Sequence, residues 1–229
     1  MNSKREDTKE IYEKRYSTFT FVPGYKYELN IINRLSNILF KNHKDLKNKS
    51  LIDLGSGFGF KTYALSKKFE NTIGVDISSN AVLISNTLND NENLKFYCSD
   101  IMDFDTDVKY DYVTAFGLSN FNLPNIDELT DQIETVINKY LKETGSFILY
   151  SGTDFSGKSP TGWYNHTKKE LKKLKNKLET KFYGWDIKMI FPHKSIVNYT
   201  KIGKTNLIYE LVKILIKKRR EYLIVISKS

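Results

Sequence analysis

Cysteine is almost absent from this chain, which contains a single one, Cys98. One cysteine cannot form a disulfide within the chain and cannot supply a zinc site made of several thiolates. Long apolar stretches are also missing, and no run approaches the ~18 residues that a membrane-spanning helix needs. The opening residues, MNSKREDTKE, are charged and unlike a secretory signal. We therefore expect a cytoplasmic protein without a membrane span.

Linkers rich in proline or glycine, internal repeats and low-complexity tracts are absent as well. A chain of 229 residues can bury one sizeable core but is short for two ordinary domains. Its hydrophobic fraction of 40% is typical of a globular protein rather than a disordered one. The sequence therefore predicts a single domain over residues 1–229.

The formal net charge of +9 has two interpretations. It suits an anionic partner such as a nucleic acid, a nucleotide or a phosphorylated metabolite. It also suits a chain in which lysine and asparagine are abundant everywhere and the lysines occupy polar helix faces, since net charge acts on solubility before it acts on function. Charge alone does not decide between them.

Short apolar segments alternate with amphipathic ones along the chain. We expect strands at residues 51–54, 72–75, 94–98, 110–116, 146–150, 185–191 and 222–227. Helices are expected up to about residue 47, at 61–69, 79–88, 127–141 and 207–216, and after Thr167, which has the spacing of a capping box with Glu170. This alternation predicts a mostly parallel sheet with helices on both faces.

A glycine-rich segment, DLGSGFG at residues 53–59, stands where the first strand turns into a helix. Glycine allows a tight turn and the close approach of a ligand to the backbone. A dinucleotide-binding loop would read Gly-x-Gly-x-x-Gly, but counting from Gly55 its third glycine position holds Phe60. The pattern Asp-x-Gly-x-Gly-x-Gly instead resembles motif I of the class I S-adenosylmethionine-dependent methyltransferases.

Four further segments resemble this family in the expected order. Asp76 closes the second strand, where a carboxylate can accept both ribose hydroxyls. Asp100 follows the third strand, where the family places an acid on the adenine amino group and an apolar neighbour against the ring. Residues 110–113 and 142–147 resemble the fourth-strand motif and the turn before the fifth strand, although Glu143 and Thr144 replace a proline and a glycine of that turn. Each acid taken alone is equally suited to a cap or turn.

The resemblance implies a Rossmann-like, doubly wound, seven-stranded and mostly parallel sheet with a late antiparallel strand. It divides the domain into an N-terminal helical cap (1–47), a cofactor-binding core (48–151) and a region with the acceptor loop, the last strands and an inserted helix (152–229). The implied cofactor is S-adenosylmethionine, the product S-adenosylhomocysteine, and no metal is expected. The implied cofactor-binding residues are Tyr16, Asp53, Gly55, Ser56, Gly57, Gly59, Asp76, Ile77, Asp100, Ile101 and Phe116.

Methyl transfer from a sulfonium needs chiefly alignment of the acceptor, and a general base only when the acceptor arrives protonated. We expect His166, on the loop after the fifth strand, to be this base, and Tyr25 in the N-terminal segment to contribute as a second catalytic residue. His166 also stands beside a helix cap, where it would be merely solvated.

Several acceptor classes are disfavoured by what the sequence lacks. Residues 115–120, AFGLSN, are unlike the Asn/Asp-Pro-Pro-Tyr motif of enzymes that methylate DNA or glutamine amines. Covalent methylation of cytosine or uracil needs a nucleophilic cysteine near the acceptor, but Cys98 lies in the third strand. No cluster of carboxylates suggests the magnesium site of catechol-type enzymes.

The leading hypothesis is therefore O- or N-methylation of a small anionic acceptor, such as a phosphorylated metabolite, a nucleotide sugar or a polysaccharide precursor, by a monomer or homodimer. One alternative is an RNA methyltransferase that uses the basic run KKRR at residues 217–220. The other is an inactive, cofactor-binding subunit whose helix at 207–216 docks a partner, rather than packing on its own sheet.

Overall fold

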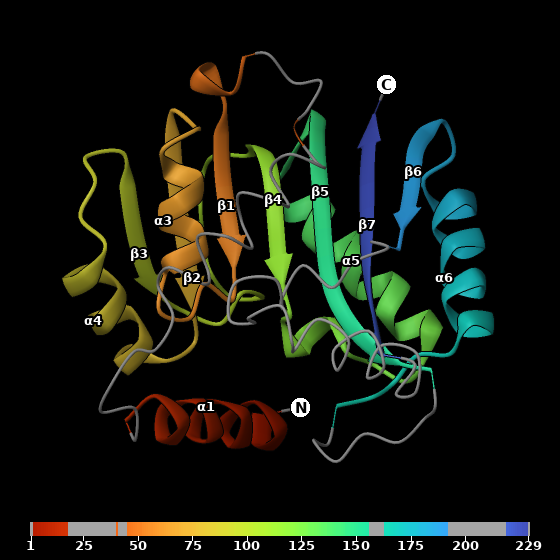
Figure 1. Cartoon of the computed structure of the whole chain (residues 1–229), viewed down its shortest axis with the longest axis horizontal. Helices are drawn as coiled ribbons and strands as arrows, with labels where there is room; N and C mark the ends of the chain where they lie inside the picture. Colours follow the sequence, from red (N-terminus) through yellow and green to blue (C-terminus); the bar gives the residue numbers. More distant parts are fainter. Residues whose placement is uncertain (1, 18–39, 41–44, 156–162, 192–218, 229) are drawn as a thin grey trace, which may run out of the picture. The chain divides into compact units, whose positions relative to one another are not determined.

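The computed structural model describes residues 2–17, 40, 45–155, 163–191 and 219–228 (Figure 1). Within them, seven strands follow the order β3-β2-β1-β4-β5-β7-β6. Strand β2 is parallel to both β1 and β3, and β7 is antiparallel to both β5 and β6. This is the Rossmann-like mixed sheet with a late antiparallel strand that the sequence predicts.

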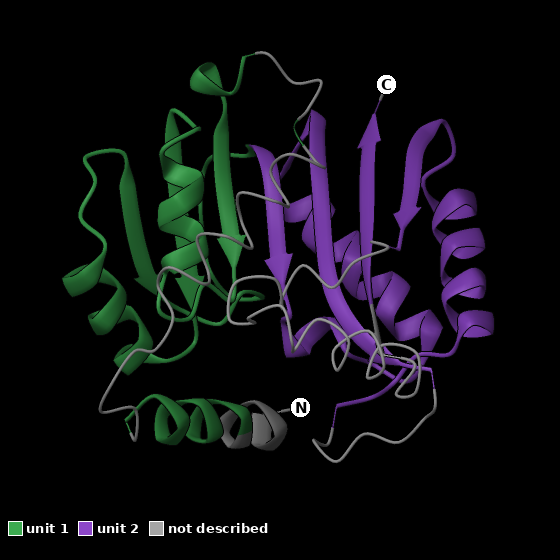
Figure 2. Cartoon of the chain, in the orientation of Figure 1, with its two compact units in different colours: residues 1–110 green, residues 111–229 purple. Residues whose placement is uncertain are grey.

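The chain forms two compact units, residues 1–110 and 111–229 (Figure 2). The boundaries at residues 47 and 151, inferred from the family resemblance, stay predictions.

Unit 1 carries the first three strands with their helices: α1 (Asn2–Ser17), η1 (Leu46–Asn48), β1 (Ser50–Leu54), α3 (Phe60–Ser66), β2 (Asn71–Asp76), α4 (Ser79–Leu88) and β3 (Leu94–Cys98). Leu54 of β1 lies opposite Val75, and Asp76 of β2 lies opposite Cys98. Because these parallel strands end in register, the loops that follow them meet at one edge of the sheet. That edge carries the predicted cofactor residues of this unit.

Unit 2 contains β4 (Tyr110–Phe116, which begins one residue before the boundary), η2 (Ser119–Phe121), α5 (Ile126–Tyr140), β5 (Leu141–Asp154), α6 (Lys168–Lys181), β6 (Trp185–Ile190) and β7 (Arg219–Lys228). The expected fifth strand, 146–150, was too short. Pairing with β7 extends it to Asp154, opposite Arg219, and at its other end it begins directly after α5. Residues 142–147, which were expected to form a turn, therefore lie inside β5. Because no turn forms there, these positions need neither the proline nor the glycine of the family motif.

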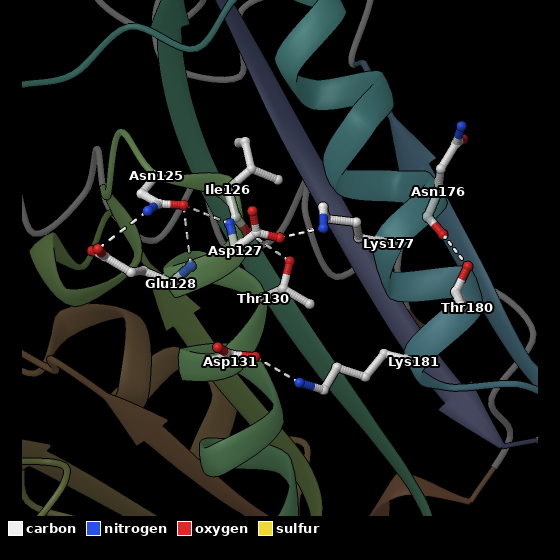
Figure 3. A network of polar contacts seen from close by, with 10 residues as sticks. All are labelled: Asn125, Ile126, Asp127, Glu128, Thr130, Asp131, Asn176, Lys177, Thr180 and Lys181. Carbon is white, nitrogen blue, oxygen red and sulfur yellow. Dashed lines mark hydrogen bonds and ion pairs between the residues drawn. The ribbon is translucent and has the colours of Figure 1, made fainter.

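Capping and charge pairing place α6 beside α5 within unit 2. Thr167 and Glu170 form the predicted capping box at the start of α6, and the apolar side of that helix buries Leu171, Leu174 and Leu178. Lys177 forms an ion pair with Asp127, and Nζ of Lys181 lies 2.6 Å from Oδ1 of Asp131 (Figure 3). These two lysines therefore form ion pairs with carboxylates of α5 and do not form an open basic surface.

Some predicted features lie outside the described residues. They are the apolar helix face at 29–39, Tyr25, the helix at 207–216 and the first half of the basic run at 217–220. Arg219, from the second half of this run, is the first residue of β7. No helix in the described part of the chain is long and apolar enough to cross a membrane.

Candidate functional site

The loop after β1 has a backbone that only glycine adopts readily. Gly55, Gly57 and Gly59 all have positive φ, at 73°, 54° and 75°. The amides of Gly55 and Ser56 both donate to the carbonyl of Val75, at 2.8 and 3.0 Å, which ties the loop to the end of β2. The alternate spacing of the glycines thus follows from three left-handed residues in one turn.

Aromatic rings also lie where side chains on the glycines would be. A Cβ added to Gly59 would lie 2.4 Å from Cζ of Phe96, and one added to Gly74 would lie 2.5 Å from the same ring. A Cβ on Gly57 would lie 2.8 Å from the hydroxyl of Tyr16. The loop is therefore packed on Phe96 and approached by Tyr16.

The polar residues of the first motif have different surroundings. Asp53 is buried and accepts a 2.6 Å hydrogen bond from the hydroxyl of Thr62, so it anchors α3. The Ser56 hydroxyl is buried without a hydrogen-bond partner among the described residues. Because an unpaired buried polar group costs about 1–3 kcal/mol, Ser56 is suited to a polar atom of a ligand.

Asp76 links the glycine loop to the turn after β2. It is 6% exposed, and its two oxygens accept hydrogen bonds from the amides of Gly57 at 2.8 Å and Ser78 at 3.0 Å. Burial raises the pKa of Asp76 above its usual value, against the effect of these amides. A carboxylate has about four acceptor positions, so it can shape the turn and still accept ligand hydroxyls. Ile77, half-buried, follows it directly.

Asp100 shapes the turn after β3. Its Oδ1 accepts from the amide of Met102 at 2.8 Å, and the neighbouring Ile101 is buried. The amide of Ser99 donates to the carbonyl of Asp76 at 2.9 Å, which joins the two turns. The structure thus brings Asp53, Asp76, Asp100 and the glycine loop to one edge of unit 1.

Helix α1 adds to this edge Tyr16, whose role in cofactor binding stays a prediction, and a residue that the sequence did not point to. The Tyr16 ring meets Phe58 edge-on, with centroids 4.8 Å apart, and burial together with the charge of Asp76 raises the Tyr16 pKa. Glu13 accepts hydrogen bonds at the start of α4 from the Ser78 hydroxyl and the Ser79 amide. No sequence pattern connects residue 13 with residue 78, because the contact is not local.

In unit 2, β4 ends at Phe116, whose ring lies 6.3 Å from that of Tyr150. The next residue, Gly117, has a φ of 66° and donates its amide to the Tyr150 carbonyl at 2.8 Å. No atom of the described residues lies within 4 Å of a Cβ added to Gly117. Phe116 itself is 9% exposed.

His166 is fully buried, so the alternative of a merely solvated histidine is wrong. Its Nε2 lies 2.9 Å from the carbonyl of Leu123, while Nδ1 has no partner among the described residues. The rings of Tyr164 and Tyr222 pack on it edge-on. Burial lowers the pKa of His166, against the hydrogen bond to Leu123, and so favours the neutral ring. With its proton on Nε2, the ring keeps a basic lone pair on Nδ1.

In the described part of the chain, no group of three or more His, Cys, Asp or Glu side chains is arranged to hold a metal ion.

A family model described as a methyltransferase domain matches residues 45–222. The ribosomal RNA small subunit methyltransferase A of Mycoplasma mycoides subsp. mycoides is 32% identical over 96 residues, which cover 41% of this chain and 35% of that relative. The chain thus spans about a third of the length of this curated relative.

Two solved structures are similar in fold. Phosphoethanolamine N-methyltransferase 2 of Haemonchus contortus, in complex with phosphomonomethylethanolamine and S-adenosylhomocysteine, has a TM-score of 0.61 at 13% identity, covering 86% of this chain and 52% of that one. The DhpI–SAH complex has a TM-score of 0.63 at 16% identity, covering 98% of this chain and 96% of that one.

Proposed function

The chain belongs to the methyltransferase domain family, and from this premise we propose that it transfers the methyl group of S-adenosylmethionine to an oxygen or nitrogen atom of a small anionic acceptor. The observation that carries the proposal is the glycine loop with positive φ at three residues, bound through the amide of Gly57 to the buried carboxylate of Asp76. We place this reaction in the cytoplasm.

The residues at this edge fit the cofactor. Asp76 has acceptor capacity for the ribose hydroxyls, and the Ser56 hydroxyl needs a polar partner. Ile77 and Ile101 offer apolar surface for the adenine ring, with Asp100 beside them for its amino group. When bound, S-adenosylmethionine supplies a methyl group already activated on a sulfonium. The task left to the chain is to orient the acceptor and exclude water.

The proton of a hydroxyl or amine acceptor has a proposed destination in unit 2. His166 is held neutral by burial and has an unpartnered Nδ1 among the described residues, so this nitrogen can take up a proton. We propose that it accepts this proton. Replacing it, as in His166→Ala, should slow methyl transfer and leave binding of S-adenosylhomocysteine unchanged; full activity would remove it from the mechanism.

Two observations support an anionic small molecule as the acceptor. The net charge of +9 favours anions in general. The fold also resembles that of a phosphoethanolamine N-methyltransferase, whose complex holds a phosphorylated amine. RNA is the second candidate, because the identity to a ribosomal RNA methyltransferase covers 96 residues.

The test begins with calorimetric titration of the purified protein with S-adenosylmethionine and S-adenosylhomocysteine. We expect saturable binding at one site per chain. Asp76→Asn should weaken binding by about tenfold or more, because hydrogen bonds to a charged group contribute about 1.5–3 kcal/mol. Asp90→Asn, at an exposed loop position, is the matched control.

The outcomes separate the hypotheses. Equal affinity of Asp76→Asn and wild type would refute the ribose assignment. Absence of binding by folded wild-type protein would mean a degenerate or partner-dependent cofactor site, and would favour an inactive subunit over an enzyme. Once binding is established, methyl transfer from labelled cofactor to phosphorylated metabolites, nucleotide sugars or RNA identifies the acceptor class.

A further inference from the structure

We infer that Glu13 is a positioning residue for the cofactor site: it fastens α1 to the start of α4 and thereby holds Tyr16 on the glycine loop. The inference rests on the proposed function, since it takes that loop as the cofactor site. It concerns unit 1 alone, where α1 lies beyond the ends of the parallel strands and packs against α4 (Figure 1).

The first turn of a helix has amides without partners inside the helix. In α4 these amides are satisfied from two sources. Ser78, the residue before the helix, accepts from the amide of Ala81 at 3.2 Å. The carboxylate of Glu13 accepts from the amides of Ser79 at 2.7 Å and Asn80 at 3.2 Å, and from the Ser78 hydroxyl at 2.8 Å. A side chain from another helix therefore completes the cap.

The charge of Glu13 suits this position. A carboxylate at the start of a helix interacts favourably with the helix dipole. Burial acts to raise the pKa of Glu13, but the hydrogen bonds from Ser79, Ser78 and Asn80 outweigh it and lower the pKa to about 2. The group is consequently ionised near neutral pH.

The consequence reaches the cofactor loop through Tyr16. Residues three apart in a helix share a face, so the attachment at Glu13 sets the position of Tyr16. The Tyr16 hydroxyl lies 2.8 Å from a Cβ added to Gly57, and its ring packs on Phe58. Gly57, which Tyr16 approaches, donates its amide to Asp76 at 2.8 Å, so α1 is attached beside the turn that holds the proposed ribose carboxylate.

The test compares Glu13→Ala and Glu13→Gln with Glu10→Ala, a substitution at an exposed position of the same helix. Hydrogen–deuterium exchange of residues 8–17 is measured on the ligand-free proteins, and dissociation of S-adenosylhomocysteine by stopped flow. Glu13→Ala should accelerate both by about tenfold, because three charge-assisted hydrogen bonds are lost. Glu13→Gln, which keeps an acceptor oxygen without the charge, should lie between, and Glu10→Ala should match wild type.

A double-mutant cycle separates positioning from general stabilisation. If Glu13 acts through Tyr16, Tyr16→Ala should weaken binding of S-adenosylhomocysteine by about tenfold in the wild type and by much less in Glu13→Ala. Additive losses, or unchanged exchange in Glu13→Ala, would overturn the inference. Failure of the wild type to bind the ligand would refute the proposed function instead, and the exchange experiment would still test the attachment of α1.

Discussion

Each glycine of the loop after β1 has a different neighbour, and the sequence motif alone does not show this difference. Gly57 leaves space for Tyr16, whereas Gly59 leaves space for Phe96 of β3. Gly55 donates its amide to Val75. The sequence predicts that three glycines stand together, but which neighbour each one accommodates follows only from the packed structure.

Gly59→Ala should destabilise the fold more than an alanine at another left-handed glycine. Gly184 is the matched control, since its φ is 83° and no described atom lies within 4 Å of an added Cβ. Gly184→Ala should cost about 1–2 kcal/mol for the backbone alone. Gly59→Ala should cost a further ~1–3 kcal/mol, because the new Cβ overlaps the Phe96 ring. Urea unfolding measures both, and equal losses would contradict the packing duty of Gly59.

His166 should make stability depend on pH. Burial lowers its pKa in the folded state, so the unfolded chain binds the proton more readily. Its contribution is therefore complete above about pH 6.5, the usual pKa of histidine, and is lost as the pH falls toward the lower folded pKa. Glu170, whose charge acts in the opposite direction, and the rings of Tyr164 and Tyr222 face it.

His166→Gln tests this dependence, since the amide can still donate to the carbonyl of Leu123 but cannot titrate. Unfolding in urea between pH 5 and pH 8 should show a smaller loss of stability at the acid end for the variant than for wild type. Parallel profiles would mean that His166 does not titrate with folding.

Secondary-structure elements follow the sequence pattern closely where their signals are local. The third strand at 94–98 and the helix at 79–88 have the predicted bounds. The fifth strand was predicted too short, because its extension depends on pairing with β7, as between Asp154 and Arg219, which are 65 residues apart in the chain. Local pattern therefore predicts an element's type, and tertiary pairing determines its length.

The capping box of α6 provides a test at this scale. Thr167→Ala removes the side-chain acceptor for the Glu170 amide and should lower the free energy of unfolding by about 1 kcal/mol. Thr180→Ala, the same substitution in the last turn of the same helix, should leave stability nearly unchanged or raise it slightly. Equal losses of stability for the two variants, in thermal or urea unfolding, would show that the capping box makes no specific contribution to stability.

Ion pairs between α5 and α6 should matter less than this cap. The side chain of Asp131, a partner of Lys181, is 69% exposed, and ion pairs open to solvent are screened by salt.

At the scale of the whole molecule, the net charge of +9 should make KM depend on ionic strength. For an anionic small acceptor, raising the ionic strength from about 50 to about 200 mM should raise KM severalfold and leave kcat unchanged, because the Debye length is only ~10 Å at 0.1 M. Affinity for S-adenosylhomocysteine should change little. An RNA acceptor would instead lose about a thousandfold or more in affinity over this range, because many counterions are released on binding. A KM that does not depend on salt would show that the net charge gives no support for an anionic acceptor.

The sequence by itself determined the class of this protein: strands and helices alternate with local periodicity, and five ordered motifs place glycines and acids at strand ends. Such signals suffice because turn geometry and parallel-strand register depend on a few neighbouring residues. Only the tertiary structure decided that Glu13 caps α4, that Phe96 lies under Gly59 and that His166 is buried. The physical reason is that burial and partnership arise between segments far apart in the chain, where no local pattern of residues records which side chains will meet.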